Sequence, residues 1–383
     1  MYHVFQIGLG CFFRLHYSPL SIIFISLYNL RINRMRKQTR TVAIGSVRIG
    51  GSNPIVLQSM TKTETTNVAG CLKQIEKLVK AGAGLVRIAV PTRADTEAFG
   101  KIVQKSPIPL VADIHFSPDR AIEAIEAGAA KIRLNPGNVK NKDDILRIID
   151  CAKRHHIAIR IGVNEASIRD LKHDVGRDQR VSLMLQEMTG FVRMFEQNGF
   201  ENLVLSAKSA DTVRTIEINR AISQTFDYPV HIGLTHAGLL EDALVPSSVA
   251  IGALLAEGIG DTVRVSIAGD PVQEIEAGKK ILASVGLYKQ SQPELIVCPT
   301  CGRCQIDVVG LAKKVRKLLQ KSSKPIRVAV MGCVVNGPGE AADADLAICA
   351  GAGKGFLYKN GQKIAAVDEA NLLDAISEQL LTF

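Results

Sequence analysis

The chain lacks tryptophan altogether, and aromatic residues make up only 5% of its 383 residues. Its 8 cysteines are too few for a disulfide scaffold, and 32 glycines with 14 prolines are too few for a fibrous protein. The 46% apolar content is in turn too high for a disordered chain. The length suits one large α/β barrel or two to three smaller domains.

Acidic side chains are absent from the first 40 positions, which hold six lysines and arginines. The net charge is +10, so the rest of the chain carries only +4. No basic block there is long enough to follow a phosphate backbone, and we expect no nucleic-acid partner.

Residues 1–34 differ from the rest of the chain, because they contain seven of its 18 aromatic residues. The apolar stretch Leu20–Leu30 is too short to span a bilayer, and most of the basic residues follow it, unlike in a signal peptide. We interpret residues 1–34 as translated upstream sequence before a start at Met35, with a weak targeting segment as the alternative. We expect no membrane partner.

From residue 55 onward, short apolar runs alternate with amphipathic helices. The runs are rich in Val, Ile and Leu, as strands buried on both faces are. They are Ile55–Ser59, Leu85–Val90, Leu110–Ile114, Lys131–Leu134, Ile157–Val163, Asn202–Ser206, Val230–Leu234 and Thr262–Ile267. The predicted helices include Asn67–Ala81, Ser117–Ala127, Val181–Asn198, Val245–Glu257 and Pro271–Leu287.

Eight such βα units predict a (β/α)8 TIM barrel over residues 35–290. A doubly wound open sheet would use the same units, but no G-x-G-x-x-G follows the first strand. The polar stretch Glu165–Arg180 is a candidate mobile loop over the barrel mouth.

Residues 291–383 predict a second, small α+β domain. It begins with a cysteine-rich turn and continues with the helix Val308–Gln320 and the strands Ile326–Met331 and Ala344–Cys349. A hairpin around Asn360-Gly361 and a final helix, Asn371–Leu381, complete it.

Four predicted strands each carry one arginine between branched apolar residues, namely Arg87, Arg133, Arg160 and Arg264. A charge inside a buried strand is costly unless it is paired. Four separate structural ion pairs would explain the pattern. Four guanidinium groups around one barrel mouth favour instead a ligand that carries phosphate.

Polar residues also end several strands. Asp113 and His115 end the third strand, Asn135 follows the fourth, Asn164 the fifth and Lys208 the sixth. Catalytic residues of TIM barrels lie at these carboxyl ends of the strands, so each is a candidate ligand contact.

The cysteines Cys298, Cys301 and Cys304 lie three residues apart, with Cys333 on a later glycine-rich turn. Such thiolates bind either zinc or an iron–sulfur cluster. Free thiols also indicate a reducing compartment, and we expect a cytoplasmic protein.

Read together, Cys298-Pro-Thr-Cys301-Gly-Arg and Met331-Gly-Cys333-Val-Val-Asn-Gly-Pro-Gly-Glu340 resemble bacterial 4-hydroxy-3-methylbut-2-enyl diphosphate synthases of the two-domain type. The resemblance extends from about Arg36 to the C-terminus. It includes Gln58–Thr61, Ala112–Phe116, Arg133–Asn138, Arg160–Asn164, Gly258–Thr262 and Arg264–Ser266.

The resemblance implies an enzyme of the non-mevalonate isoprenoid pathway, with a TIM barrel followed by an iron–sulfur domain. Its substrate is 2-C-methyl-D-erythritol 2,4-cyclodiphosphate, which it opens reductively and dehydrates. Reduced ferredoxin or flavodoxin delivers two electrons singly. We expect at least a homodimer, with the active site shared between subunits, because the linker leaves the barrel at the end opposite its mouth.

The resemblance also assigns residues. Its [4Fe–4S] cluster falls on Cys298, Cys301, Cys333 and Glu340, and Cys304 has no counterpart among the ligands. A carboxylate binds iron less tightly than a thiolate does, so Glu340 can yield its position to a substrate oxygen. The substrate-binding residues fall on Arg87, Arg133, Asn135, Arg160, Asn164, Lys208 and Ser266.

One position departs from the family. Where relatives read Thr-Glu-Ala-Gly, this chain reads Thr235-His236-Ala237-Gly238. His236 could donate the proton instead of the glutamate, or the proton route could differ. Two other functions stay open, namely a zinc-binding cysteine module on an inactive phosphate-binding barrel, and a barrel enzyme of another pathway.

Overall fold

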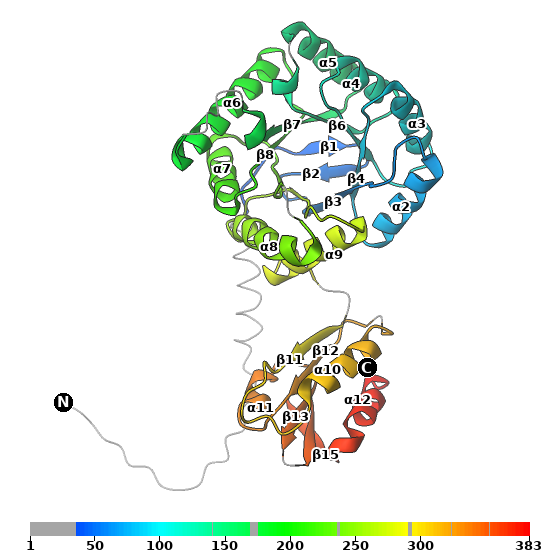
Figure 1. The fold of residues 1–383 in the computed structure, drawn as a ribbon, viewed down its shortest axis with the longest axis vertical. Coiled ribbons are helices and arrows are strands. Elements are labelled where there is room, and N and C mark those ends of the chain that lie inside the picture. The colour runs from blue at the N-terminus through cyan, green and yellow to red at the C-terminus, as the bar shows by residue number, and fades with distance from the viewer. Residues whose placement is uncertain are drawn as a thin grey trace, which may run out of the picture. The chain divides into compact units, whose positions relative to one another are not determined.

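Eight parallel strands and eight helices alternate in the first part of the chain (Figure 1). The computed structural model describes residues 36–139, 141–168, 175–235, 238–289, 293–322, 324–351 and 353–383. The strands are β3 (Val56–Met60), β4 (Leu85–Ala89), β5 (Leu110–Asp113), β6 (Lys131–Leu134), β7 (Ala158–Asn164), β8 (Leu203–Lys208), β9 (His231–Ile232) and β10 (Thr262–Val263). The helices are α2 (Val68–Lys80), α3 (Arg93–Val103), α4 (Pro118–Glu126), α5 (Lys142–Arg154), α6 (Arg177–Gln197), α7 (Thr212–Thr225), α8 (Leu240–Ala256) and α9 (Pro271–Ser284).

The strands pair in the order β8-β7-β6-β5-β4-β3-β10-β9. A parallel bridge between Leu205 and Val230 joins the two ends of this order, and the sheet closes on itself. The predicted TIM barrel is therefore confirmed. Because strand side chains alternate, Ile132 and Leu134 of β6 pack outward in the core beneath the helices, whereas Arg133 turns inward.

Caps explain where several helices begin. The Ser117 side chain accepts the Arg120 N–H ahead of Pro118, as the sequence predicted for α4. For α8 the predicted start at Val245 was wrong, because the helix begins at Leu240 and contains Pro246. Two acids in its first turn suit the positive end of the helix dipole.

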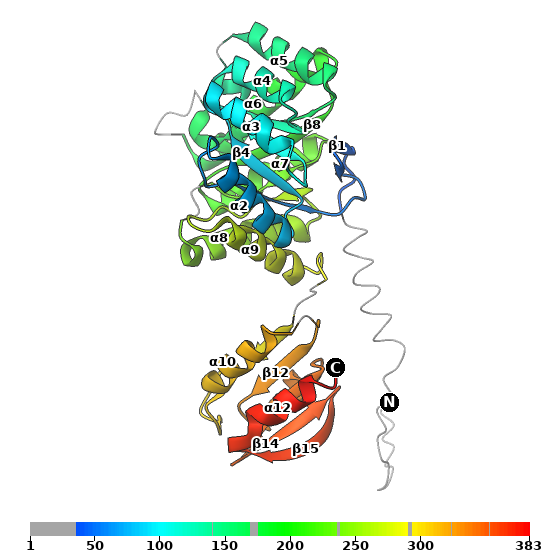
Figure 2. The same cartoon turned by 90° about the vertical axis from the view of Figure 1, so that its right-hand side faces the viewer.

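A short hairpin that the sequence analysis did not predict lies at the amino-terminal end of the barrel strands (Figures 1 and 2). It consists of β1 (Val42–Ile44) and β2 (Val47–Ile49). Its side chains form one apolar cluster with the inward residues Leu85, Val111, Ala158 and Val204. The hairpin thus fills the floor of the barrel, opposite the strand ends that carry the polar residues.

The described chain divides after Tyr288 into two units. The second contains one sheet in the order β11 (Glu294–Val297), β12 (Arg327–Met331), β13 (Leu346–Gly351), β14 (Lys354–Lys359) and β15 (Gln362–Asp368). Its helices are α10 (Val308–Leu319), α11 (Gly337–Glu340) and α12 (Leu372–Leu380). The β14–β15 hairpin turns at Asn360-Gly361 as predicted, whereas β11 was not predicted.

Candidate functional site

Among the described residues, six lysine and arginine side chains face the interior of the barrel. Arg87, Arg133 and Arg160 are at most 9% exposed, and Lys208 at the end of β8 is 7% exposed. Arg264 follows β10, and Lys131, which sequence reasoning missed, is fully buried on β6. Space is tight between them, because a Cβ added at Gly162 would lie 3.1 Å from Nε of Arg133.

Asp113 connects two of the arginines. Its carboxylate lies 3.6 Å from Nε of Arg87 and 3.6 Å from Nη1 of Arg133. Nη1 of Arg133 also lies 3.0 Å from Nε2 of His115. Burial alone would raise the pKa of Asp113, but the positive charges of Arg87 and Arg133 outweigh it and hold that pKa well below its usual range. Asp113 therefore stays ionised and orients both arginines.

The remaining cations repel one another. Burial, reinforced by neighbouring arginines, lowers the pKa of Arg160 and of Lys208 well below their usual values. Burial also lowers the pKa of Arg87 to about 10, although Asp113 opposes that shift. An anion placed among these side chains would remove this repulsion.

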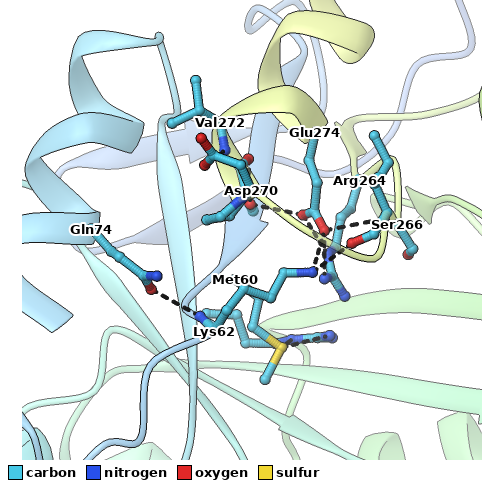
Figure 3. A network of polar contacts seen from close by, with 12 residues as sticks. Met60, Lys62, Gln74, Arg264, Ser266, Asp270, Val272 and Glu274 are labelled. Carbon is cyan, nitrogen blue, oxygen red and sulfur yellow. Dashed lines mark hydrogen bonds and ion pairs between the residues drawn. The ribbon is translucent and has the colours of Figure 1, made fainter. Parts of the chain in front are cut away.

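Glu274 is a second buried carboxylate, near the start of α9, and sequence reasoning missed it. Figure 3 shows Lys62 and Arg264 converging on it. Arg264 donates from Nε over 3.1 Å and from Nη2 over 3.0 Å, and the Lys62 ammonium lies 3.1 Å away. Ser59 donates a hydrogen bond of 2.7 Å. Arg264 is thus held by a protein carboxylate.

The other predicted contacts lie at the ends of the barrel strands. Asn135 is 2% exposed, and its side chain accepts the Gly137 N–H in the turn after β6. Asn164 is the last residue of β7, in register with Lys208 of β8. Ser266 donates to the Leu234 carbonyl over 3.1 Å. The predicted catalytic residue His236 lies outside the described residues. The N-terminal residues 1–34 and residues 169–174 of the predicted loop also lie outside them.

In the second unit, the predicted ligands line one pocket. Cys298 follows β11, Cys301 lies on the next turn, Cys333 follows β12, and Glu340 ends α11. The pocket is about 100 Å³ and also contains Thr300, Arg303, Met331, Asn336 and Gly337. Three thiols and a carboxylate on one cavity are a donor set that suits an iron–sulfur cluster.

The surroundings of Cys333 and of Cys349 shift the pKa values of the two thiols in opposite directions. Hydrogen bonds from the backbone N–H groups of Asn336 and Val335, and the guanidinium of Arg303, lower the pKa of Cys333. Burial instead raises the pKa of Cys349, on β13, to about 12. These contacts favour the thiolate of Cys333, which is the form that binds metals.

Cys304 is not among the residues that line this pocket. Its Sγ accepts the Cys301 N–H over 3.4 Å, and a Cβ added at Gly332 would lie 2.6 Å from it. It packs against the apolar core that includes Val308. Within the described ranges, no group of three His, Cys, Asp or Glu side chains is arranged to hold a single metal ion.

None of the described helices is both long and apolar enough to cross a membrane.

Comparison with known proteins covers both units. Residues 39–279 match the sequence model of the GcpE TIM-barrel domain, and residues 294–382 match that of the GcpE protein C-terminal domain. A crystal structure of dihydropteroate synthase from Stenotrophomonas maltophilia covers 66% of this chain and 100% of its own, with a TM-score of 0.50 and 14% identity. That likeness concerns the barrel fold alone.

Two relatives carry the name 4-hydroxy-3-methylbut-2-en-1-yl diphosphate synthase (flavodoxin). The protein from Malacoplasma penetrans is 44% identical over 347 residues, which are 90% of this chain and 94% of the relative. The protein from Aquifex aeolicus is 42% identical over 346 residues, or 90% of this chain and 96% of the relative. With both of its units matched and this identity over nine-tenths of its length, the chain belongs to the GcpE family.

Proposed function

We propose that this protein converts 2-C-methyl-D-erythritol 2,4-cyclodiphosphate to 4-hydroxy-3-methylbut-2-enyl diphosphate. In this reaction a ring C–O bond breaks and a hydroxyl group leaves as water. When substrate and product are both written as fully protonated acids, the reaction takes up two electrons and two protons. The observation that carries the proposal is the charge of the barrel interior. Among the described residues, three of its six lysine and arginine side chains form ion pairs with a carboxylate, namely Arg87 and Arg133 with Asp113 and Arg264 with Glu274. A cyclic diphosphate brings two negative charges to balance the rest.

The barrel residues bind and orient this substrate. Arg87 and Arg133, fixed by Asp113, present guanidinium groups to one phosphate, and Arg160 with Lys208 faces the other. Asn135 and Asn164 supply amide donors at the strand ends. His236 stays our proposal for the group that delivers a proton to the leaving hydroxyl.

The cysteine pocket fits the proposed cofactor, a [4Fe–4S] cluster. Cys298, Cys301 and Cys333 would hold it by thiolates and Glu340 by a carboxylate that can be exchanged. When bound, the cluster would supply electrons and a Lewis-acidic iron. Asn336 and Val335 stabilise the Cys333 thiolate through their N–H groups.

Reduced flavodoxin, which the relatives' names include, is our proposed electron donor, with ferredoxin as the alternative. We also propose a cytoplasmic homodimer whose subunits share active sites. The chain leaves the barrel at the end of α9, and helices of a TIM barrel end at the floor rather than at the mouth.

The test is turnover. Anaerobically purified protein should be brown, and with reduced flavodoxin it should consume the cyclodiphosphate and release the linear diphosphate. A colourless protein with one tightly bound zinc ion would contradict this proposal and support the zinc alternative.

A further inference from the structure

Lys131 has a position that the proposed reaction does not explain. It is 0% exposed and lies on β6 two residues before Arg133, so both side chains enter the barrel interior. Its register partners are Val111 and Ala158, which belong to the apolar floor. Its Nζ has no hydrogen-bond partner among the described residues. A permanently charged ammonium would be costly there.

Other buried side-chain nitrogens on the barrel strands also lack hydrogen-bond partners within the described chain, among them Nε of Arg160 and Nε2 of His231. His231, on β9, is 0% exposed and uses Nδ1 to contact Oγ1 of Thr262 at 2.7 Å. Burial and the charge of Arg160 lower the pKa of His231 and of Lys131 well below their usual values. These shifts favour the neutral forms of both side chains in the ligand-free barrel.

The carboxylates nearby are already engaged. Asp113 contacts Arg87 and Arg133, and Glu274 contacts Arg264 and Lys62. The charged or titratable groups that face this interior from the surrounding strands are Arg87 on β4, Asp113 on β5, Arg133 on β6, Arg160 on β7, Lys208 on β8, His231 on β9 and Arg264 after β10. Most of them are cations, so only an added anion can make a charge on Lys131 favourable.

We propose that the Lys131 amine accepts a proton when an anion binds in the barrel. The amine is neutral while the barrel is empty, and it is protonated when an anion binds to the arginines nearer the mouth. The proton comes from solvent, joins the Lys131 amine to form an ammonium, and returns to solvent when the anion leaves. This inference rests on the proposed function for the identity of the anion, and it adds a sixth basic residue to those predicted to hold it. By linkage, anion binding then weakens as the pH rises.

The experiment is titration calorimetry of the cluster-loaded protein without reductant, with the cyclodiphosphate as probe. Both phosphates of that probe are fully ionised at pH 8, so the probe gains no proton itself. The dependence of the binding heat on the ionisation enthalpy of the buffer gives the number of protons taken up. We expect Lys131→Met to reduce the uptake by about one proton relative to the unmodified protein.

Lys62→Met is the matched control, because the Lys62 ammonium is 32% exposed and already paired with Glu274. It should leave the number of protons unchanged. Equal uptake in the Lys131→Met variant and the unmodified protein would overturn the inference. If Lys131→Met does not fold, the unmodified protein still decides, because the rise in Tm caused by sulfate should shrink between pH 6 and pH 9. A pH-independent rise would overturn the inference.

Sulfate, which is also fully ionised in this range, separates the two proposals. If sulfate causes Lys131-dependent proton uptake but the cyclodiphosphate does not bind, the inference holds and the proposed function fails. If the cyclodiphosphate binds and is turned over without that uptake, the function holds and the inference fails.

Discussion

Arg264 and Glu274 form a bidentate ion pair inside the barrel unit. The Glu274 side chain is fully buried, and the Arg264 side chain is 11% exposed. The pair fixes α9 to the loop after β10, at the mouth. Arg264 therefore has a carboxylate partner within the protein. Arg160 differs, because its Nε has no hydrogen-bond partner among the described residues.

The first prediction concerns the stability that this pair contributes. Arg264→Gln removes one of the two positive charges that are paired with the buried Glu274 carboxylate. The substitution should lower the free energy of unfolding by about 3 kcal/mol. Arg220→Gln is the control, because Arg220 forms a similar pair with Glu257 in which both side chains are more than a third exposed. The control should cost less than about 1 kcal/mol. Urea unfolding of both variants measures this, and equal losses would mean that burial of the Arg264 pair adds nothing.

The second prediction is the dependence of stability on acid pH. The positive charges of Arg264 and Lys62 outweigh burial and lower the pKa of Glu274 below 4.5, so the unfolded chain binds the proton more readily. The stabilisation is complete above pH 4.5 and is lost as the pH falls through the lowered folded-state pKa. Glu274→Gln should therefore show a flatter loss of Tm between about pH 5 and pH 3 than the unmodified protein. Parallel curves would contradict the assignment.

The third prediction separates the cysteines. Changing Cys298, Cys301 or Cys333 to serine should abolish or severely reduce iron and sulfide content, because thiolates anchor the cluster. Cys304→Ser should retain it, since Cys304 packs against the core beside Gly332. Iron analysis and visible absorption after anaerobic reconstitution provide the measurement. If Cys304→Ser loses as much iron as the others, Cys304 rather than Glu340 is the fourth ligand.

The fourth prediction concerns Arg133 and Arg160 as substrate contacts. Lysine retains the charge but loses the guanidinium fork, so Arg133→Lys and Arg160→Lys should each lower kcat/KM by roughly 30-fold to several thousand-fold. Tm and cluster content should change little. A lowered Tm with unchanged kcat/KM would instead return both arginines to purely structural roles.

The fifth prediction addresses the shared active site. An Arg133→Ala chain and a Cys301→Ser chain are each expected to be inactive alone. Mixed under conditions of subunit exchange, they should regain part of the activity, because one hybrid site combines an intact barrel with an intact cluster pocket. Each variant exchanged with itself is the control. No recovery in exchanged heterodimers would show that each subunit works with its own cluster.

The barrel could be predicted from sequence because its strands are buried on both faces and its helices have local capping signals. Ser117 and Pro118 are one such signal, and both lie where expected. The β1–β2 hairpin was missed because three-residue strands leave no periodicity to detect. The predicted start of α8 was wrong because Pro246, a residue type that favours the first turn of a helix, lies inside this helix.

The site could be predicted only where a residue type was unusual for its strand. Arginines between branched residues stood out, whereas Lys131 begins its strand and resembled a surface residue at the strand edge. Its spacing of two from Arg133 was the available signal, since it places both on one face. Glu274 gave no signal, because the ion pairs with Lys62 and Arg264 depend on the closed barrel.

The hairpin at the barrel floor has a kinetic consequence. With β1 and β2 packed against Leu85, Val111, Ala158 and Val204, the hairpin covers the amino-terminal end of the barrel, and we expect molecules to enter and leave through the carboxyl ends of the strands. Incoming and outgoing molecules must then use the same passage in turn. If the arginines bind the diphosphate as we propose, bound product blocks the next substrate. Product should then inhibit competitively, and its departure becomes a step that can limit the overall rate.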